Sequence, residues 1–420
     1  MDSRRHPLLL LGALLLGAGV LGMPSGCIVG ILAPEDAGAD AAGDGPGVDT
    51  GSSSGASGGS SGTGSSSGSA SSSGGSSGSS SGASGSGGSS GSSSGGGDAG
   101  CSPNLSTDAM NCGRCGHVCD PGMMCSGGTC APKTLRTGSG TVSDLRTVGS
   151  QLFWMEGLAG LYWCTLPDCS SVTTVVSGTT LAGYAVSGST AFVVEGVITN
   201  AVVRAYGTDG SGAKGDLTVA LQGLKGPMDV DSTNVFYTAR DGSGSPFFGY
   251  LPQNSSSATA TDVTTYISNF QVQMRVASGG GTEYAFWSDG SSLIRCPTAN
   301  SSTPTTLGMG NGITGLAVDS QYVFWTASGD GKVIRCDGTG ANCSPILQGQ
   351  ATPSRVAVDT TGIAWANAAS GLSGTVSECT YPDCGGAFLL AQGQASPSEL
   401  AMDATYVYWA TGATIWRVPR

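Results

Sequence analysis

Histidine is almost absent from this chain of 420 residues. The sequence contains only His6 and His117, so everything after residue 117 lacks the commonest general base and the commonest zinc ligand of proteins. A Ser-His-Asp triad is therefore excluded from the C-terminal part of the chain. Enzyme classes that depend on histidine in that part are disfavoured for the same reason.

Charge is also scarce, and its balance is acidic. Charged residues make up 11% of the chain, less than half of the roughly 25% usual in globular domains. The net charge is −12 at pH 7, which disfavours phosphate contacts with nucleic acid and electrostatic attachment to a membrane surface. We therefore expect no nucleic-acid partner, and contact with a membrane only through an anchor.

The N-terminus has the pattern of an export signal. Arg4 and Arg5 precede an apolar stretch over residues 8–21, which is shorter than the roughly 20 apolar residues that a membrane span needs. Such a stretch after a positive start is typical of a signal peptide. We assign residues 1–26 to this signal.

The end of the signal resembles the lipoprotein box of bacteria, in which a cysteine is lipidated and becomes the new N-terminus. Ser25-Gly26-Cys27 match the box, and Pro24 departs from it. The resemblance implies a lipid on Cys27 and an exported protein of the cell envelope, in the outer membrane and facing the periplasm or the exterior. Two alternatives stay open: a signal cleaved without lipidation, and an uncleaved anchor, because residues 28–32 continue the apolar run.

Residues 27–100 have the composition of a disordered tether. Residues 35–49 are acidic and rich in Ala and Gly, and residues 51–97 are almost purely Ser and Gly. Such segments cannot bury enough apolar surface to fold. As a random coil, roughly 70 residues would reach about 40–50 Å.

A small cysteine-rich module is predicted over residues 101–131. An even set of close cysteines in an exported chain is typical of disulfides, although the sequence does not decide their pairing. Zinc, an iron–sulfur cluster and haem fit less well; for haem, Gly116 stands where C-x-x-C-H requires the histidine. The segment resembles small modules beside such tethers in bacterial surface lipoproteins, a resemblance that implies no chemistry. Its cysteines are Cys101, Cys112, Cys115, Cys119, Cys125 and Cys130.

Residues 133–420 form a repeat array. Each copy has a short apolar strand, a turn and a second strand with an aromatic or apolar anchor, and no stretch shows a sustained helical period. The anchors are about 42 residues apart, close to the ~40–45 residues of a four-stranded propeller blade. We therefore expect an all-β fold, a seven-bladed β-propeller with six blades as the alternative. The anchors are Trp154, Val193, Tyr237, Trp287, Trp325, Trp365 and Trp409.

The last copy ends on its third strand, so its fourth strand must come from elsewhere. Thr134 to Thr137 lies where a fourth strand would precede the first copy. We predict that it pairs with Ile415 to Val418 and closes the ring, which hides two strand edges.

The repeat resembles that of YWTD-type propellers. Val323-Phe324-Trp325-Thr326 followed by Lys332-Val333-Ile334-Arg335 carries the resemblance, and residues 408–417 repeat it. The chain departs from that family because its Asp survives only as Asp289, and because the family usually has six blades. The resemblance implies the architecture and no particular activity.

The remaining cysteines fit this register. Three local pairs flank the predicted turns between third and fourth strands, where a hairpin brings cysteines within disulfide reach. Each bond would contribute about 2 kcal/mol. Cys296 occupies the first position of a fourth such pair without a partner, so we expect it to be free or bonded outside this set. The pairs are Cys164–Cys169, Cys336–Cys343 and Cys379–Cys384.

Recurrent polar residues are interpreted as structural. Aspartates after the first strand are expected to form turns, and aromatic anchors are expected to fill the core. Arginines on the third strand are expected either to be solvated or to pack on the blade. The Asp-Gly pairs at 330–331 and 337–338 predict tight type I′ turns. The aspartates are Asp231, Asp319, Asp359 and Asp403, and the arginines are Arg204, Arg295, Arg335 and Arg417.

These observations assign no catalytic, cofactor-binding or metal-binding residue and imply no cofactor. We expect a monomeric, non-enzymatic propeller that binds a protein or glycan through the loops joining strands four to one and two to three. Those loops include two near copies, residues 348–354 and 392–398. The alternative is a metal-dependent lactonase with Asp, Glu and Asn ligands. Carboxylates converging in the channel would favour the alternative, and small apolar or hydroxyl side chains there would favour binding.

Overall fold

The computed structural model describes residues 104–157, 160–196, 201–217, 226–240, 246–255, 261–265, 273–279, 281–298 and 304–420. The predicted signal, the tether, Cys27 and Cys101 lie outside these ranges. Across the described ranges, no helix is long and apolar enough to cross a membrane.

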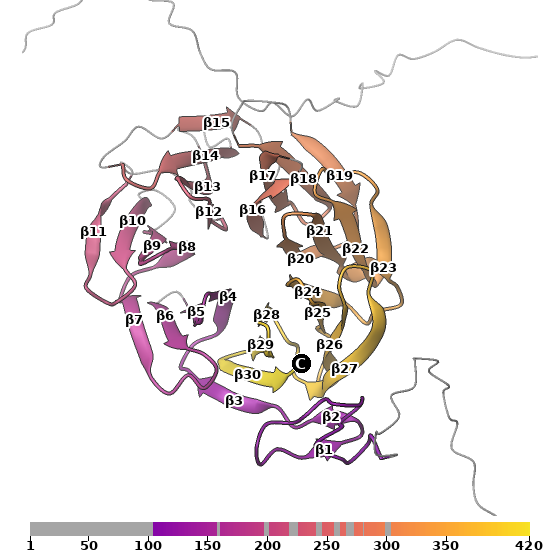
Figure 1. Cartoon of the computed structure of the whole chain (residues 1–420). Coiled ribbons are helices and arrows are strands. Elements are labelled where there is room, and N and C mark those ends of the chain that lie inside the picture. The colour runs from indigo at the N-terminus through magenta and orange to yellow at the C-terminus, as the bar shows by residue number, and fades with distance from the viewer. Residues whose placement is uncertain are drawn as a thin grey trace, which may run out of the picture. The chain divides into compact units, whose positions relative to one another are not determined.

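Seven four-stranded antiparallel sheets stand as blades around a common axis (Figure 1). The predicted seven-bladed β-propeller is therefore confirmed, and the six-bladed alternative is wrong. The strands are named from inner to outer: blade 1 has β4 (Val142–Val148), β5 (Gln151–Glu156), β6 (Gly160–Thr165) and β7 (Val172–Ser177), and blade 2 has β8 (Leu181–Ser187), β9 (Thr190–Glu195), β10 (Val202–Gly207) and β11 (Ala213–Asp216). Blade 3 has β12 (Asp229–Val230), β13 (Asn234–Arg240), β14 (Pro246–Pro252) and β15 (Thr261–Thr265), blade 4 has β16 (Met274–Gly279), β17 (Thr282–Ser288), β18 (Ser292–Pro297) and β19 (Thr305–Met309), and blade 5 has β20 (Ile313–Val318), β21 (Tyr322–Ala327), β22 (Lys332–Asp337) and β23 (Ser344–Leu347). Blade 6 has β24 (Pro353–Val358), β25 (Gly362–Asn367), β26 (Gly374–Thr380) and β27 (Gly385–Gln394), and blade 7 has β28 (Glu399–Met402), β29 (Tyr406–Thr411), β30 (Thr414–Pro419) and β3 (Lys133–Thr137).

The ring closes through its first and last strands. β3 pairs with β30 as the outer strand of blade 7, with Thr134 opposite Trp416 and Thr137 opposite Thr414. The predicted closure is confirmed, although the pairing begins at Thr414 rather than at Ile415. A bulge between Thr134 and Arg136 accounts for the shifted register.

The core lies between the blades, where the aromatic anchors are buried. Trp154, Trp287 and Trp409 have no exposed surface, and burying a large apolar side chain stabilises a fold by about 1.5–3 kcal/mol. The anchors are thus core residues, as expected. Trp365 Nε1 donates to Gln350 Oε1 at 2.8 Å, and Trp409 Nε1 donates to Gln394 Oε1 at 3.0 Å.

Gln350 and Gln394 occupy the same place in the two near-copy loops. The similarity of these loops therefore has a structural cause, because each loop supplies the acceptor for a buried indole.

The Asp-Gly segments do not form the type I′ turns that the sequence predicts. Ser328–Asp330 is a short 3-10 helix, and Gly331 follows it with a left-handed backbone, φ 62°. In the second segment the left-handed residues are Gly340 and Asn342, and Gly338 is not among them. Asp337 accepts hydrogen bonds from the amides of Thr339 and Ala341, so this aspartate caps a longer loop.

The described cysteines are all bonded. The structure contains the three hairpin disulfides, and in the module it contains Cys112–Cys125 and Cys119–Cys130. Cys115 and Cys296 are also disulfide-bonded. Of the two outcomes left open for Cys296, a free thiol is therefore excluded.

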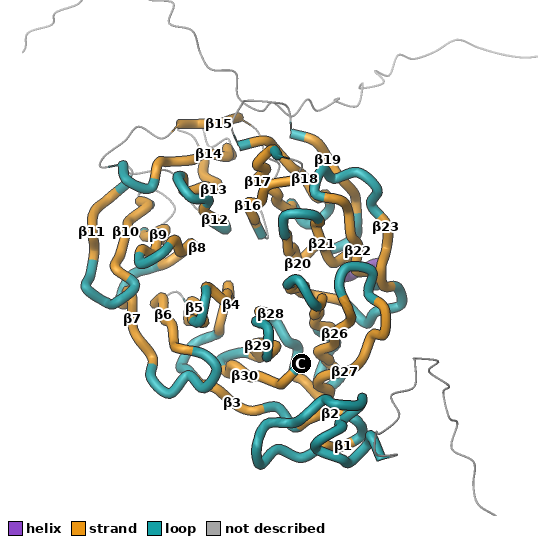
Figure 2. The backbone as a smooth tube through the Cα atoms, viewed as in Figure 1, coloured by secondary structure: helices purple, strands orange, loops and turns teal. Residues whose placement is uncertain are grey.

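The cysteine-rich module packs against the outside of the ring. It contains β1 (Cys125–Ser126) and β2 (Thr129–Cys130) and is otherwise mostly loop (Figure 2). The Arg114 guanidinium lies 3.6 Å from the centre of the Phe388 ring on β27, and His117 Nε2 lies 3.0 Å from the Pro419 carbonyl oxygen. Module cysteines and residues of blades 6 and 7 share one apolar cluster.

Candidate functional site

The innermost strands of the seven blades surround the axis of the ring (Figure 1). Each inner strand begins at the face that carries the loops between strands two and three and between strands four and one. We call this the upper face, and the opposite one the lower face. Side chains at the start of the inner strands therefore lie near the upper face.

Equivalent positions of the seven inner strands can be compared, and few of them carry a charged side chain. In every blade, one inner-strand residue lies opposite the residue that precedes the anchor. Four of these seven positions carry alanine, and three carry a charged side chain. In blade order they are Arg146, Ala185, Asp229, Arg275, Ala317, Ala357 and Ala401.

All three guanidinium nitrogens of Arg146 donate hydrogen bonds. Its Nε and Nη2 donate to the two oxygens of Asp144 at 2.7 and 3.0 Å, and its Nη1 donates to Asp229 at 3.2 Å. Burial by itself would lower the pKa of Arg146, but Asp144 and Asp229 outweigh burial and raise it. This arginine is therefore fixed in its charged form.

A bulge supports this arrangement. It lies between Ser143 and Arg146 and places Asp144 in the left-handed region, with φ 49°. A non-glycine residue adopts that conformation only where its surroundings impose it. Tyr184, from the next blade, donates its hydroxyl to the Asp144 carbonyl at 2.6 Å.

Arg355 in blade 6 and Glu399 in blade 7 form a second ion pair between inner strands. Arg355 Nη2 donates to Glu399 Oε1 at 3.0 Å, and its Nη1 donates to the Thr314 carbonyl of blade 5 at 2.8 Å. Both side chains are largely buried. The pair therefore links three successive blades beside the axis.

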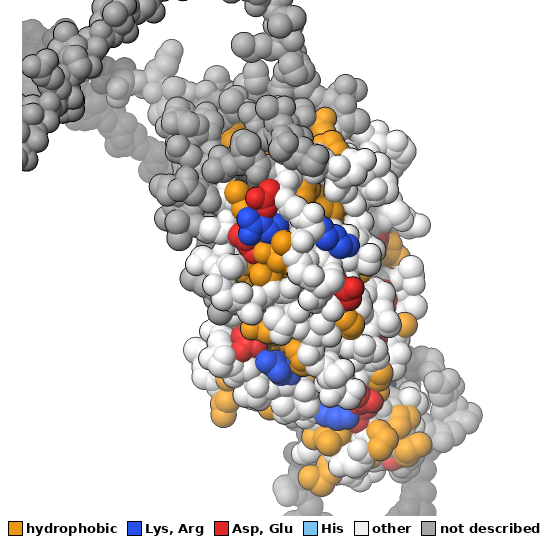
Figure 3. Space-filling view, turned by 90° about the vertical axis from the view of Figure 1, so that its left-hand side faces the viewer, with side chains coloured by type: hydrophobic (Ala, Val, Ile, Leu, Met, Phe, Trp, Pro, Cys, Tyr) orange, Lys and Arg blue, Asp and Glu red, His pale blue; other side chains and the backbone are white. Residues whose placement is uncertain are grey.

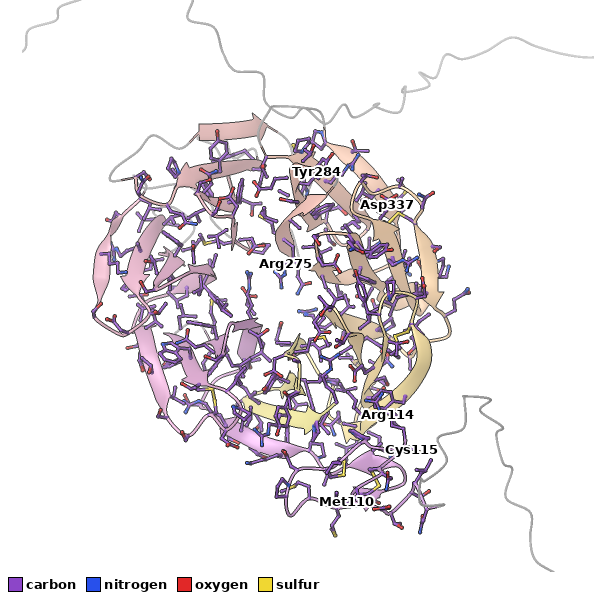
Figure 4. The ribbon with its side chains drawn as sticks, viewed as in Figure 1. Met110, Arg114, Cys115, Arg275, Tyr284 and Asp337 are labelled. Atoms are coloured by element: carbon purple, nitrogen blue, oxygen red, sulfur yellow. A yellow bond between two sulfur atoms is a disulfide. The ribbon has the colours of Figure 1, made fainter. Side chains whose placement is uncertain are left out.

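Arg275 is the inner-strand arginine without such a partner. Its Nη1 donates to the carbonyl of Met274, its own chain neighbour, at 2.7 Å. Within the described ranges, Arg275 takes part in no ion pair. Figure 4 shows its side chain at the inner edge of the ring, pointing toward the axis. Burial lowers the pKa of Arg275, and the nearby charge of Arg146 lowers it further.

The carboxylates of the inner strands do not gather into a metal site. Asp144 and Glu399 are each paired with an arginine, and Asp229 accepts from Arg146 and from the Val276 amide at 2.7 Å. Among the described residues, one group of three candidate ligands was found, Cys112, Cys119 and Cys130. All three are disulfide-bonded. Within the described ranges, no carboxylate cluster therefore supplies the site that a metal-dependent lactonase would need.

The described inner-strand residues match neither of the two patterns that would decide between binding and metal-dependent hydrolysis, namely converging carboxylates or a lining of small apolar and hydroxyl side chains. The structure places arginine–carboxylate pairs along the inner strands, together with alanines.

The recurrent aspartates of the turns have the predicted role. The Oδ1 atom of each accepts hydrogen bonds from the amides two and three residues further along, at 2.5–2.9 Å. They lie on the lower face, in the loops that join the first and second strands. The turn interpretation is confirmed for Asp231, Asp319, Asp359 and Asp403.

The arginines of the third strands pack on their blades, as expected. Those of blades 4, 5 and 7 lie over tyrosine rings, at 4.2–4.7 Å between guanidinium carbon and ring centre. Arg204 instead forms ion pairs with Glu195 and Asp216. Figure 3 shows basic and acidic side chains lying next to one another on the outer side of the ring. The tyrosine rings beneath Arg295, Arg335 and Arg417 are those of Tyr284, Tyr322 and Tyr406, in that order.

The inner-strand charges are the polar residues that our sequence analysis missed. Aspartates after the first strand and arginines on the third recur visibly in the copies, whereas the charges within the first strand do not recur. Aligning the copies on their anchors would have placed Arg146, Asp229 and Arg275 in one row with alanines. That contrast is the signal that could have found them.

Comparisons with known proteins support the fold. No protein-family model matches the chain, and no curated protein matches it. Similar solved structures include a chain of the mitotic checkpoint complex, 12% identical with a TM-score of 0.52, covering 69% of this chain and 95% of that chain. An inactivated virginiamycin B lyase from Staphylococcus aureus is 9% identical, with a TM-score of 0.49 and coverage of 69% and 98%.

A chain of the nidogen/laminin complex is 13% identical, with a TM-score of 0.40, and covers 50% of this chain and 80% of that chain. At such identities the likeness concerns the β-propeller fold alone.

Proposed function

We propose that the protein is an exported binding protein of the cell envelope, held by a lipid on Cys27, whose propeller retains a partner without chemical turnover. The observation that supports this most is that the inner-strand carboxylates named below are already paired with arginines. Acid–base or metal chemistry needs a carboxyl group that is free to move a proton or hold an ion. Asp144, Asp229 and Glu399 are instead engaged by arginines.

The N-terminal segments support the location. The positive start, the short apolar stretch and Ser25-Gly26-Cys27 fit a lipoprotein signal, and a long Ser/Gly tether follows. A tether of this composition gives reach rather than a fixed orientation. Intact-mass analysis of membrane fractions should find a chain that begins at Cys27 and carries acyl groups.

A protein is the partner class that we favour over a glycan. Propellers present rigid loops around a ring, and one solved structure that resembles this chain comes from a protein assembly, the mitotic checkpoint complex. On the upper face the exposed Leu372 projects from the loop of blade 6 between strands two and three. Leu372 therefore offers a solvent-exposed position from which contacts of the upper face can be probed.

The proposal is tested by photo-cross-linking in the cells that export the protein. A photoreactive residue at Leu372 probes the upper face. The same residue at Asp383, exposed in the loop of blade 6 between strands three and four, probes the lower face and is the matched control. We expect a discrete partner from position 372 and none from position 383. Turnover of esters, lactones or glycosides with added Ca²⁺, Mg²⁺ or Zn²⁺, abolished by Glu399→Gln, would contradict the proposal.

A further inference from the structure

We propose that Arg275 is a binding residue, which receives a carboxylate of the ligand through its Nε and Nη2 atoms beside the axis of the ring. This inference rests on the proposed binding function and names the chemistry that the ligand presents. Of the three inner-strand arginines, Arg146 and Arg355 are paired with carboxylates, whereas Arg275 is in no ion pair within the described ranges.

The free donors of Arg275 lie on one edge of its guanidinium. Nη1 is occupied by the Met274 carbonyl, whereas Nε and Nη2 make no hydrogen bond within the described ranges. Neither atom is a buried nitrogen without a partner, unlike Arg136 Nε and Arg295 Nη1, and Arg275 itself is partly buried. An Nε–Nη2 edge matches the two oxygens of a carboxylate.

The two other inner-strand arginines show what Arg275 lacks. Arg146 and Arg355 each hold a carboxylate through two nitrogens. A partly buried cation is costly unless it is paired, and the lowered pKa of Arg275 reflects that cost. A carboxylate from outside would complete the same pairing that the fold itself supplies twice.

The surroundings favour one carboxylate over a polyanion. Asp144 and Asp229 lie near enough to act on the charge of Arg275, so a second negative charge at this place would meet repulsion. The chain carries a net charge of −12, which opposes the approach of a highly charged ligand. A single planar carboxylate satisfies both restrictions.

Arg275 lies beside the axis, level with Arg146, the fifth residue of β4 (Val142–Val148). It is the second residue of β16 (Met274–Gly279), a strand that begins at the upper face. The carboxylate can belong to an acidic side chain of a protein partner or to a free small acid. The chemistry is the same in both cases, and the experiment separates them.

The test uses the full chain and the reactivity of individual arginines. Phenylglyoxal modifies accessible guanidinium groups, and peptide mapping reports each arginine separately. We expect Arg275 to react faster than Arg146 and Arg355. The probes are malonate, a short glutamate-rich peptide, its glutamine counterpart as the matched control, and inorganic phosphate. A carboxylate that fills the site should slow modification of Arg275 by about tenfold when its concentration is about ten times Kd.

Protection by the glutamate peptide but not by malonate would identify an acidic protein segment, and protection by malonate would identify a small acid. Protection by phosphate alone, or by no probe, would overturn the proposal. Thermal unfolding adds an independent readout, because a bound carboxylate should raise Tm of the native protein. Arg275→Gln should abolish that rise, Arg275→Lys should retain part of it, and Lys214→Gln, at an exposed position, should retain all of it.

The outcome separates this inference from the proposed function. If the partner cross-links to position 372 equally well in Arg275→Gln, the inference fails and the proposed function stands. If carboxylates protect Arg275 but no partner is captured, the site stands and the proposed function fails. Circular dichroism of Arg275→Gln and Arg275→Lys checks that both variants are folded.

Discussion

Arg417 Nε donates a hydrogen bond to Asp120 Oδ2 at 3.0 Å, and both side chains are almost completely buried. This contact joins the cysteine-rich module to the last strand of the ring. Arg417 also contacts Asp168 in blade 1 at 3.2 Å and lies over the ring of Tyr406 in blade 7. One side chain therefore connects the module with both blades at the closure of the propeller.

Asp120→Asn should destabilise the whole propeller rather than the module alone. Removing one partner of a buried ion pair costs about 3–5 kcal/mol, and we expect the lower end because Asp168 remains beside Arg417. Denaturant unfolding followed by tryptophan fluorescence measures the loss. Asp168→Asn is the control and should cost far less than Asp120→Asn, because Asp168 is exposed and exposed ion pairs contribute little. Equal losses in the two variants would contradict this account of the closure.

Gln350→Ala should destabilise blade 6. It removes the acceptor of the Trp365 indole and one partner of Asn367, which lies at 3.2 Å, and a buried donor left without a partner costs about 1–3 kcal/mol. Gln348→Ala changes an exposed side chain of the same loop and should alter stability by less than about 0.5 kcal/mol. If both variants unfold like the native protein, the loop does not have the structural role assigned to it.

Glu156 should make the propeller sensitive to acid. Burial raises its pKa, but hydrogen bonds from the amides of Ser139 and Gly140 outweigh burial and hold the pKa below its ordinary value of 4.5. The stability that Glu156 contributes is therefore present above that value and is lost as pH falls through the lowered folded pKa. Unfolding free energies measured from neutral to acidic pH should fall less steeply for Glu156→Gln.

Glu283 should have the opposite effect. Burial raises its pKa, and the hydrogen bond to Asp231 and the charge of that group raise it further. Its contribution to stability is therefore complete below the unfolded pKa and is lost as pH rises through the folded pKa. Glu283→Gln keeps a donor toward Asp231 and should remove this loss. A steeper decrease with rising pH in the variant than in the native protein would reverse the sign and refute the pairing.

The architecture was predictable because its signals are local and repeated. The anchors recur along the chain, and the missing strand of the last copy pointed directly to Thr134. The inner-strand pairs carry no such signal, since Arg146 and Asp229 are 83 residues apart and belong to blades that are not sequential neighbours. Their approach depends on how the blades are arranged around the axis, which no local pattern records.

The pairing of β3 with β30 also sets an order of events during synthesis. β3 (Lys133–Thr137) is among the first parts of the propeller to be made, and its partner (Thr414–Pro419) is the last. Until that partner emerges, β3 has no strand to pair with and blade 7 has only β28 and β29. The ring can therefore close only after Thr414–Pro419 has been translated, and a product truncated before Thr414 would keep the unpaired edges that favour aggregation.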